Sequence, residues 1–302
     1  MTQFLQALIN GTAIAAVYCL IALGFVIIYK SMQVLSFAQP GLLLLGAYWV
    51  VYFTSVWSWP FWVAIVLAIG LAAATGIVIE RGFLRPMVGK PVFAVAIMTI
   101  GIDVVLRIIA IDLIGINIRS MGDPWGIDVF RFEMSETSAL ILQHRQLAQV
   151  VTAVIVVILL LAFFKYSRMG LAMRATAFDQ EVALTQGVSV TSVFAMSWAI
   201  AAVLATLAGM FLGSGFGLAP SAGVTALKAL PVVVVGGLDS IPGAIVGALI
   251  IAIAEQLTVT YQPTYAAFLG QGFGQVVPYL VMFIVLLIRP YGLFGTEEVE
   301  RV

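Results

Sequence analysis

Nine long apolar segments limit what this chain can fold into more than any other feature. They cover residues 7–29, 35–54, 61–80, 92–114, 147–164, 190–213, 225–238, 242–260 and 276–289. A helix needs about 20 apolar residues to cross the hydrocarbon core of a bilayer. The chain is 63% hydrophobic and 9% charged, whereas a soluble domain carries about 25% charged residues. The sequence therefore predicts an all-α polytopic membrane protein of about eight to ten transmembrane helices, with residues 1–302 in one transmembrane domain.

The segment 225–238 is shorter than the others and contains Pro231 and Gly236. We expect it to be broken or re-entrant, which is possible only where protein covers the freed backbone groups. Interrupted helices often mark binding sites in transporters. Candidate residues for a pathway through the membrane are Gln39, Pro40, Gly41, Pro231, Gly236 and Gly237. The alternative is that these prolines and glycines serve only packing and helix bending.

Basic residues at the segment ends predict the orientation. Lys30 ends the first segment, Arg289 ends the last, and the links 80–91 and 165–189 carry further basic residues. Nine crossings with the N-terminus outside and the C-terminus in the cytoplasm agree with the positive-inside rule. The exceptions are Arg119, Arg131, Arg145 and Lys228. The first three lie in link 115–146, a long external loop of mixed charge that we expect to act as a lid or docking surface.

The link 165–189 is a polar stretch between two apolar spans, so it must lie at the membrane surface. Its apolar residues are spaced by four, three and four, as on one helix face; they are Leu171, Ala175, Phe178 and Val182. Asp179 is expected to cap a second short helix and Gly187 to end it. The segment is either an amphipathic element on lipid headgroups or a docking element for a soluble cytoplasmic protein.

Three ionisable residues lie inside the predicted spans. Asp103 and Arg107 are spaced i, i+4, so they face one side of the same helix. They form either a self-neutralising pair or a polar spot that lines a pathway. Glu255 is expected near the outer end of its span, as an interface anchor or as a pathway residue.

The sequence lacks the motifs of several enzyme and binding classes. It contains no GxxxxGK[ST] phosphate loop, no GxSxG and no HExxH. His144 and Cys19 are the sole histidine and cysteine, and the basic residues form no patch. We therefore expect no catalytic residue, no metal site, no nucleic-acid binding and no ATP binding by this chain.

Five runs of sequence, taken in order, carry a family resemblance. They are ALGFVIIYKSMQVLSFAQPGLLLLGAY (22–48), ERGFLRPMVGKPVFAVAIMTIGI (80–102), MRATAFDQEVALTQGVSV (173–190), LKALPVVVVGGLDSIPGAIVGALI (227–250) and IRPYGLFG (288–295). Together they resemble the permease subunits of branched-chain amino-acid ABC importers. Gln39 and Pro40 stand where that family usually has histidine and glycine, and Thr176 and Phe178 replace a cysteine and an acidic residue.

The resemblance implies a set of partners in a bacterial cytoplasmic (inner) membrane. They are a second permease subunit, identical or paralogous, two cytoplasmic ATPase subunits that bind ATP and Mg²⁺, an external solute-binding protein and membrane lipid. Residues 165–189 then form the cytoplasmic coupling segment. The residues expected to couple it to the ATPase are Arg174, Phe178, Asp179, Glu181, Val182 and Gly187.

The cargo implied by the resemblance is a branched-chain or other small amino acid. Related permeases carry urea, short amides and other small solutes, so these stay open as alternatives. A third reading, from a different class, is a secondary amino-acid carrier driven by an ion gradient. Solute uptake by this chain without partner subunits would distinguish such a carrier from an ABC permease.

Overall fold

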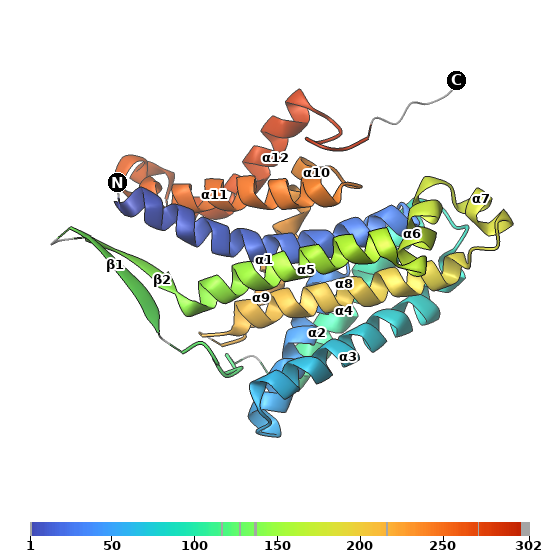
Figure 1. The fold of residues 1–302 in the computed structure, drawn as a ribbon, viewed down its shortest axis with the longest axis horizontal. Coiled ribbons are helices and arrows are strands. Elements are labelled where there is room, and N and C mark those ends of the chain that lie inside the picture. The colour runs from blue at the N-terminus through green and yellow to red at the C-terminus, as the bar shows by residue number, and fades with distance from the viewer. Residues whose placement is uncertain are drawn as a thin grey trace. The chain divides into compact units, whose positions relative to one another are not determined.

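The fold is taken from a computed structural model, which describes residues 2–115, 117–126, 128–135, 138–215, 217–270 and 272–296. Twelve α-helices are found in the described residues (Figure 1). They are α1 (Thr2–Met32), α2 (Gln39–Val51), α3 (Phe61–Ile79), α4 (Val92–Ile114), α5 (His144–Tyr166), α6 (Arg168–Phe178), α7 (Gln180–Thr185), α8 (Val190–Gly213), α9 (Ala222–Leu227), α10 (Ala229–Gly236), α11 (Ile241–Tyr265) and α12 (Val277–Ile288).

The predicted fold class is confirmed. Six helical segments in the described chain are long and apolar enough to cross a membrane: Thr2–Met32, Phe61–Met87, Val92–Leu113, His144–Tyr166, Val190–Gly213 and Ile241–Tyr265. The remaining predicted segments correspond to shorter helices. Helix α2 begins at Gln39 rather than near residue 35, because Pro40 is well suited to the first helical turn. The segment 225–238 is broken, as predicted, between α9 and α10.

The chain forms two compact units. One comprises residues 1–22, 125–154 and 228–302, and the other comprises residues 23–124 and 155–227. Helices α1 and α5 contribute residues to both units. Below, the first is called the terminal unit and the second the central unit.

Close helix packing in the central unit depends on small residues. Helices α3 and α8 run side by side (Figure 1). A Cβ at Gly76 of α3 would overlap the carbonyl oxygen of Trp198 in α8, and a Cβ at Gly209 would lie 2.7 Å from the carbonyl oxygen of Leu43 in α2. Glycine at such positions lets helix backbones approach closely, which is how membrane helices commonly associate.

In the terminal unit, α10 packs against α11 in the same way. A Cβ at Gly236 would overlap the carbonyl oxygen of Gly243, and one at Gly247 would overlap that of Val232. The C-terminal segment closes the end of α10. The backbone N–H of Leu293 donates to Val235 O at 2.8 Å, and that of Phe294 donates to Gly236 O at 3.0 Å.

The link between α4 and α5 contains an antiparallel hairpin that the sequence analysis did not predict. Strand β1 (Val129–Ser135) pairs with β2 (Ser138–Gln143). The alternation of apolar and charged residues in VFRFE was the available signal. Helix α5 begins at His144, so the end of the predicted loop 115–146 is helical. Residues 116, 127, 136 and 137 of that loop, Glu136 among them, lie outside the described residues.

The hairpin is attached to α1 through one side chain. The amide of Gln6 donates from Nε2 to Ile141 O and accepts from Ile141 N, each at 2.9 Å. An isolated two-stranded hairpin has marginal stability in water. The paired hydrogen bonds from Gln6 therefore stabilise β2 at the end of the terminal unit.

Gly76 provides a test of the glycine packing between α3 and α8. We expect Gly76→Ala to lower the free energy of unfolding in detergent by about 1–3 kcal/mol, because the added methyl group overpacks a helix contact. Gly70→Ala in the same helix is the matched control, since a Cβ there meets nothing within 4 Å. Equal stability of the two variants would contradict the assignment.

Candidate functional site

Residues 165–189, called the coupling segment below after the role expected from the sequence, fold as two short helices whose ends are defined by local capping. The hydroxyl of Ser167 accepts from Gly170 N at 2.8 Å and starts α6. The carboxylate of Asp179 accepts from Glu181 N at 2.9 Å and from Val182 N at 3.0 Å, and so starts α7. Gly187 adopts a φ of +79° just after α7. The predicted cap at Asp179 and the predicted stop at Gly187 are both confirmed.

The coupling segment is held closely to the spans of the central unit. Helix α6 turns back so tightly on α5 that a Cβ at Gly170 would overlap the carbonyl oxygen of Phe163. Met173 and Thr176 are buried on the inner side of α6. The side chain of Gln180 donates to Ser31 O at the end of α1, at 3.2 Å. These contacts give the segment a defined position relative to the ends of α1 and α5.

The outer side of the coupling segment is apolar and exposed. Phe178 has 95% of its surface exposed, and Leu171, Val182 and Leu184 are each more than half exposed. The extended backbone of Asp179, at φ −159°, separates α6 from α7. The apolar stripe predicted on one helix face is therefore divided between two helices. Arg174 and Glu181 are also exposed on these helices, so charged and apolar groups are available together for docking.

In the central unit, Asp103 caps the N-terminus of α2. Its Oδ1 accepts from the backbone N–H of Gly41 at 2.6 Å, and its Oδ2 pairs with Arg107 at 2.8 Å. A carboxylate at a helix N-terminus is favoured both by the free N–H groups and by the helix dipole. A Cβ at Gly41 would lie 2.8 Å from the Cβ of Leu106. The absence of a side chain thus allows α2 to approach Asp103.

Two polar groups near this helix start remain without hydrogen-bond partners in the described part of the chain. Gln39 is fully buried, and neither its amide nitrogen nor its amide oxygen is bonded. The Nε of Arg107 is likewise buried and unbonded. Leaving such a group unsatisfied costs about 1–3 kcal/mol. The start of α2 is therefore a place where water or a polar solute would gain hydrogen bonds.

Helix α9 lies beside one of these groups. A Cβ at Gly223 would lie 3.6 Å from Pro40 O and 4.0 Å from the Nε of Arg107. Of the pathway candidates, Gln39, Pro40 and Gly41 thus gather with Asp103 and Arg107 in the central unit. Gly24, whose Cβ would lie 2.8 Å from the Nε2 of Gln39, belongs to the same group; sequence reasoning missed Gly24 and Gly223.

Glu255 lies in a buried polar cluster of the terminal unit. One carboxylate oxygen accepts from the Nζ of Lys228 at 2.5 Å, and the other accepts from the hydroxyl of Tyr18 at 2.7 Å. Lys228, an exception to the predicted orientation, therefore has its charge neutralised inside the protein. Helix α11 extends to Tyr265, so Glu255 is farther from its helix end than the sequence predicted.

The remaining pathway candidates in the terminal unit make packing contacts. Pro231 is buried within α10, and Gly236 allows the close approach to α11. Gly237 has a φ of +110°, and a Cβ there would lie 2.5 Å from Gly295 N. The structure thus gives Gly236 and Gly237 a demonstrable packing role at the end of α10.

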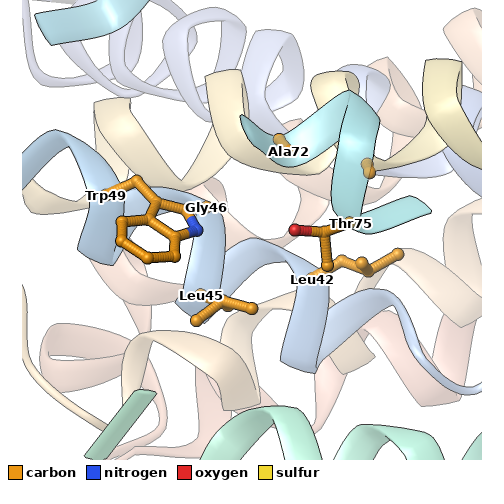
Figure 2. A pocket seen from close by; sticks show the side chains of 7 residues that line it. Leu42, Leu45, Gly46, Trp49, Ala72 and Thr75 are labelled. Carbon is orange, nitrogen blue, oxygen red and sulfur yellow. The ribbon is translucent and has the colours of Figure 1, made fainter. Parts of the chain in front are cut away.

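A small hollow lies between α2, α3 and α8 in the central unit, and it has no room for a water molecule. Figure 2 shows the indole nitrogen of Trp49 and the hydroxyl of Thr75 on either side of it. Its other lining residues are Leu42, Leu45, Gly46, Ala72 and Ala202. Ligand pockets usually measure about 300–1,000 Å³. This hollow is below that range, and we assign it no ligand.

The sequence of residues 7–286 matches the family described as "Branched-chain amino acid transport system / permease component". The chain belongs to this family. Two relatives cover almost all of this permease. The high-affinity branched-chain amino acid transport system permease protein LivH of Salmonella typhimurium is 31% identical over 99% of this chain and 98% of its own. The corresponding protein BraD of Pseudomonas aeruginosa is 29% identical over the same shares.

One solved structure is also similar to the permease. PsaBC from Streptococcus pneumoniae, in complex with Fab, aligns over 96% of this chain and 91% of that chain, with 17% identity and a TM-score of 0.46. A TM-score below 0.5 at this identity does not establish a shared function or mechanism. The family membership, the near full-length relatives and the apolar helices together establish a multi-pass membrane permease.

The cluster of Glu255, Lys228 and Tyr18 predicts a strong effect of single substitutions. Glu255→Gln leaves the Lys228 ammonium buried without a counter-charge, which typically costs about 3–5 kcal/mol. We expect the double variant Lys228→Met/Glu255→Gln to regain most of that loss, because it buries no charge. The measurement is thermal unfolding of each purified variant in detergent.

The exposed carboxylate of Glu181 supplies the control for this comparison. Glu181→Gln should change stability by no more than about 0.5 kcal/mol. If Glu255→Gln is as stable as Glu181→Gln, or if the double variant is less stable than Glu255→Gln, the pairing does not stabilise the terminal unit.

Proposed function

We propose that this chain is the membrane permease subunit of an ATP-driven importer for branched-chain or other small amino acids. Family membership carries the proposal, because the family description and the names of both relatives specify branched-chain amino acid transport. The proposed location is the bacterial cytoplasmic membrane, with the coupling segment in the cytoplasm and the hairpin outside. The proposed partners are a second permease, two ATPase subunits and an external solute-binding protein.

The surface of the coupling segment supports the proposal that ATP is hydrolysed by a separate subunit. Its exposed apolar side chains, led by Phe178, offer a docking surface beside Arg174 and Glu181. Its inner side is held by Ser167, Gly170 and Gln180. A force applied to the exposed side would pass into the spans, since the segment contacts the end of α5 closely at Gly170. ATP and Mg²⁺ would bind in the partner subunits, because the sequence has no phosphate loop.

The buried carboxylates argue against a carrier driven by a proton gradient. Proton-coupled carriers commonly use an intramembrane carboxylate that takes up the proton. In the described part of the chain, three buried carboxylates each have a basic partner: Glu80 with Arg85 at 3.2 Å, Asp103 with Arg107 at 2.8 Å and Glu255 with Lys228 at 2.5 Å. This arrangement suits an importer whose energy comes from ATP in other subunits.

The proposed pathway uses the unbonded polar groups at the start of α2. Gln39 and Arg107 would offer hydrogen bonds to a solute that passes, while apolar surroundings would suit an aliphatic side chain. Because the pathway offers few polar partners, it would bind the solute weakly. Weak binding is expected of a permease whose external binding protein supplies the affinity. Urea and short amides would use the same polar groups, so the cargo must be measured directly.

Reconstitution tests the proposed class. In vesicles, we expect the purified permease alone to take up no leucine, valine or isoleucine under a proton or sodium gradient. With its partner permease, the ATPase subunits, binding protein and internal ATP, uptake should appear. Uptake by the chain alone would identify a secondary carrier. If ATP drives the uptake of urea or amides but not of branched-chain amino acids, the chain is still an ABC permease, but its solute is different from the one proposed.

Phe178 tests the docking surface. Phe178→Asp places a charge at the centre of the apolar face, and we expect ATP-driven uptake to fall by about tenfold or more, equivalent to about 1.4 kcal/mol of lost coupling. Phe178→Leu is the matched control and should keep most of the activity. Co-purification with the ATPase subunits separates failed assembly from failed coupling. Normal assembly and uptake by Phe178→Asp would show that the ATPase docks elsewhere.

A further inference from the structure

The link between α2 and α3 has an unusual composition for a connection between two membrane helices. It runs through residues 52–60, and no charged residue occurs between Lys30 and Glu80. The sequence VWSWPFW places three tryptophans, Trp57, Trp59 and Trp62, within six positions. A loop surrounded by water is normally polar or charged. This link is therefore not built to extend into water.

The tryptophans are exposed rather than packed into the central unit. Trp57 is 49% exposed, Trp59 is 39% exposed and Trp62 is 63% exposed, and Val56 beside them is 62% exposed. Large apolar side chains exposed together indicate a surface that contacts something other than water. By contrast, Trp198 of α8 is 1% exposed and belongs to the core.

Aromatic contacts give the link a defined shape. The rings of Trp57 and Trp59 lie 5.0 Å apart, and Trp59 stacks on Phe53 at 5.8 Å. The hydroxyl of Ser55 donates to Ser120 O at 2.6 Å, which ties the link to the segment after α4. The exposed rings are thus presented by a supported loop, as an anchor requires.

The length of α3 relates the tryptophans to the bilayer. Arg81 lies 19 positions after Trp62, or about 28 Å along the helix at 1.5 Å per residue. This matches the roughly 30 Å of a hydrocarbon core. Between these two residues α3 exposes an apolar stripe that includes Val63, Val66 and Val78. One end of the stripe is aromatic and the other is basic, as expected for a helix whose ends lie at the two membrane interfaces.

We propose that Trp57, Trp59 and Trp62 form an aromatic anchor that lies in the lipid headgroup layer at the outer face of the membrane. Indole rings suit this layer because they combine a large apolar surface with an N–H donor. The basic residues Arg81 and Lys90, at the opposite end of α3, place the anchor on the outer side. The anchor sets the depth of α3 in the bilayer whatever solute is carried.

Spin labels placed along α3 test the depth of the anchor. In a Cys19→Ala background, single cysteines replace Trp59, Trp62 or Val66, and each labelled permease is reconstituted in lipid vesicles. Collision of the label with apolar oxygen and with a water-soluble nickel chelate is measured by power saturation. We expect the oxygen-to-nickel ratio to rise several-fold from position 59 through 62 to 66, because each site lies deeper in lipid. Cys19 is only 5% exposed, so the unmodified background serves if Cys19→Ala folds poorly.

Other occupants of this surface give different results. A water-exposed loop would show high nickel collision at positions 59 and 62. A protein surface, such as the second permease, would exclude both reagents at all three positions in the assembled importer. A solute-binding protein would reduce nickel collision only after it is added. Each of these outcomes would overturn the lipid anchor without affecting the proposed transport function.

The side of the membrane is tested separately in intact cells. Ser58→Cys, at the tip of the link, should react with a membrane-impermeant thiol reagent, whereas Lys90→Cys should react only after the cells are opened. The reverse pattern would place the tryptophans at the cytoplasmic face. Reaction of both cysteines in opened cells confirms that both are accessible to the reagent, and uptake by the assembled importer confirms that each variant is folded.

Discussion

Every polar group of this permease that leaves water must find a partner inside the protein, and much of the structure follows from that requirement. The first free N–H groups of α2 meet the carboxylate of Asp103, which is itself paired with Arg107. The last carbonyls of α10 accept hydrogen bonds from Leu293 and Phe294 of the C-terminal segment. Interrupted helices are thus possible because other elements complete their ends. Among the described residues, buried side-chain atoms of Gln39, Arg107 and Trp49 are left without partners; those of Gln39 and Arg107 lie at the start of α2 and are the candidate contacts for a solute.

The same requirement is met in a different way in each of the two units. Within the terminal unit, α10 is held at its start by the pair of Lys228 and Glu255, along its length by glycine contacts with α11, and at its end by the C-terminal segment. Within the central unit, the coupling segment is fixed on its inner side and apolar on its outer side. A close inner attachment with an exposed apolar face suits the docking of a separate ATPase that is proposed above.

Structural features that depend on neighbouring residues were predictable from the sequence, whereas contacts between distant residues were not. The caps at Asp179 and Gly187 depend on residues within a few positions, so the order of residues revealed them. The i, i+4 pair of Asp103 and Arg107 was visible for the same reason. The partner of Asp103 at Gly41 and the partner of Glu255 at Tyr18 are far away in the sequence, and no spacing rule connects them. The hairpin of β1 and β2 was missed because the apolar spans dominated the pattern around it, although its alternation was present.

The sequence by itself determined the class of protein, the approximate spans and the capped helices of the coupling segment, because hydropathy and helix capping act over one or two turns of chain. Only the tertiary structure decided the roles of the buried ionisable and glycine residues. It showed that Glu255 and Lys228 neutralise each other, that Gly76, Gly236 and Gly237 serve close backbone contact, and that Gln39 stays unbonded. These roles depend on which distant segments meet, and the burial of apolar surface that brings them together is a property of the whole fold.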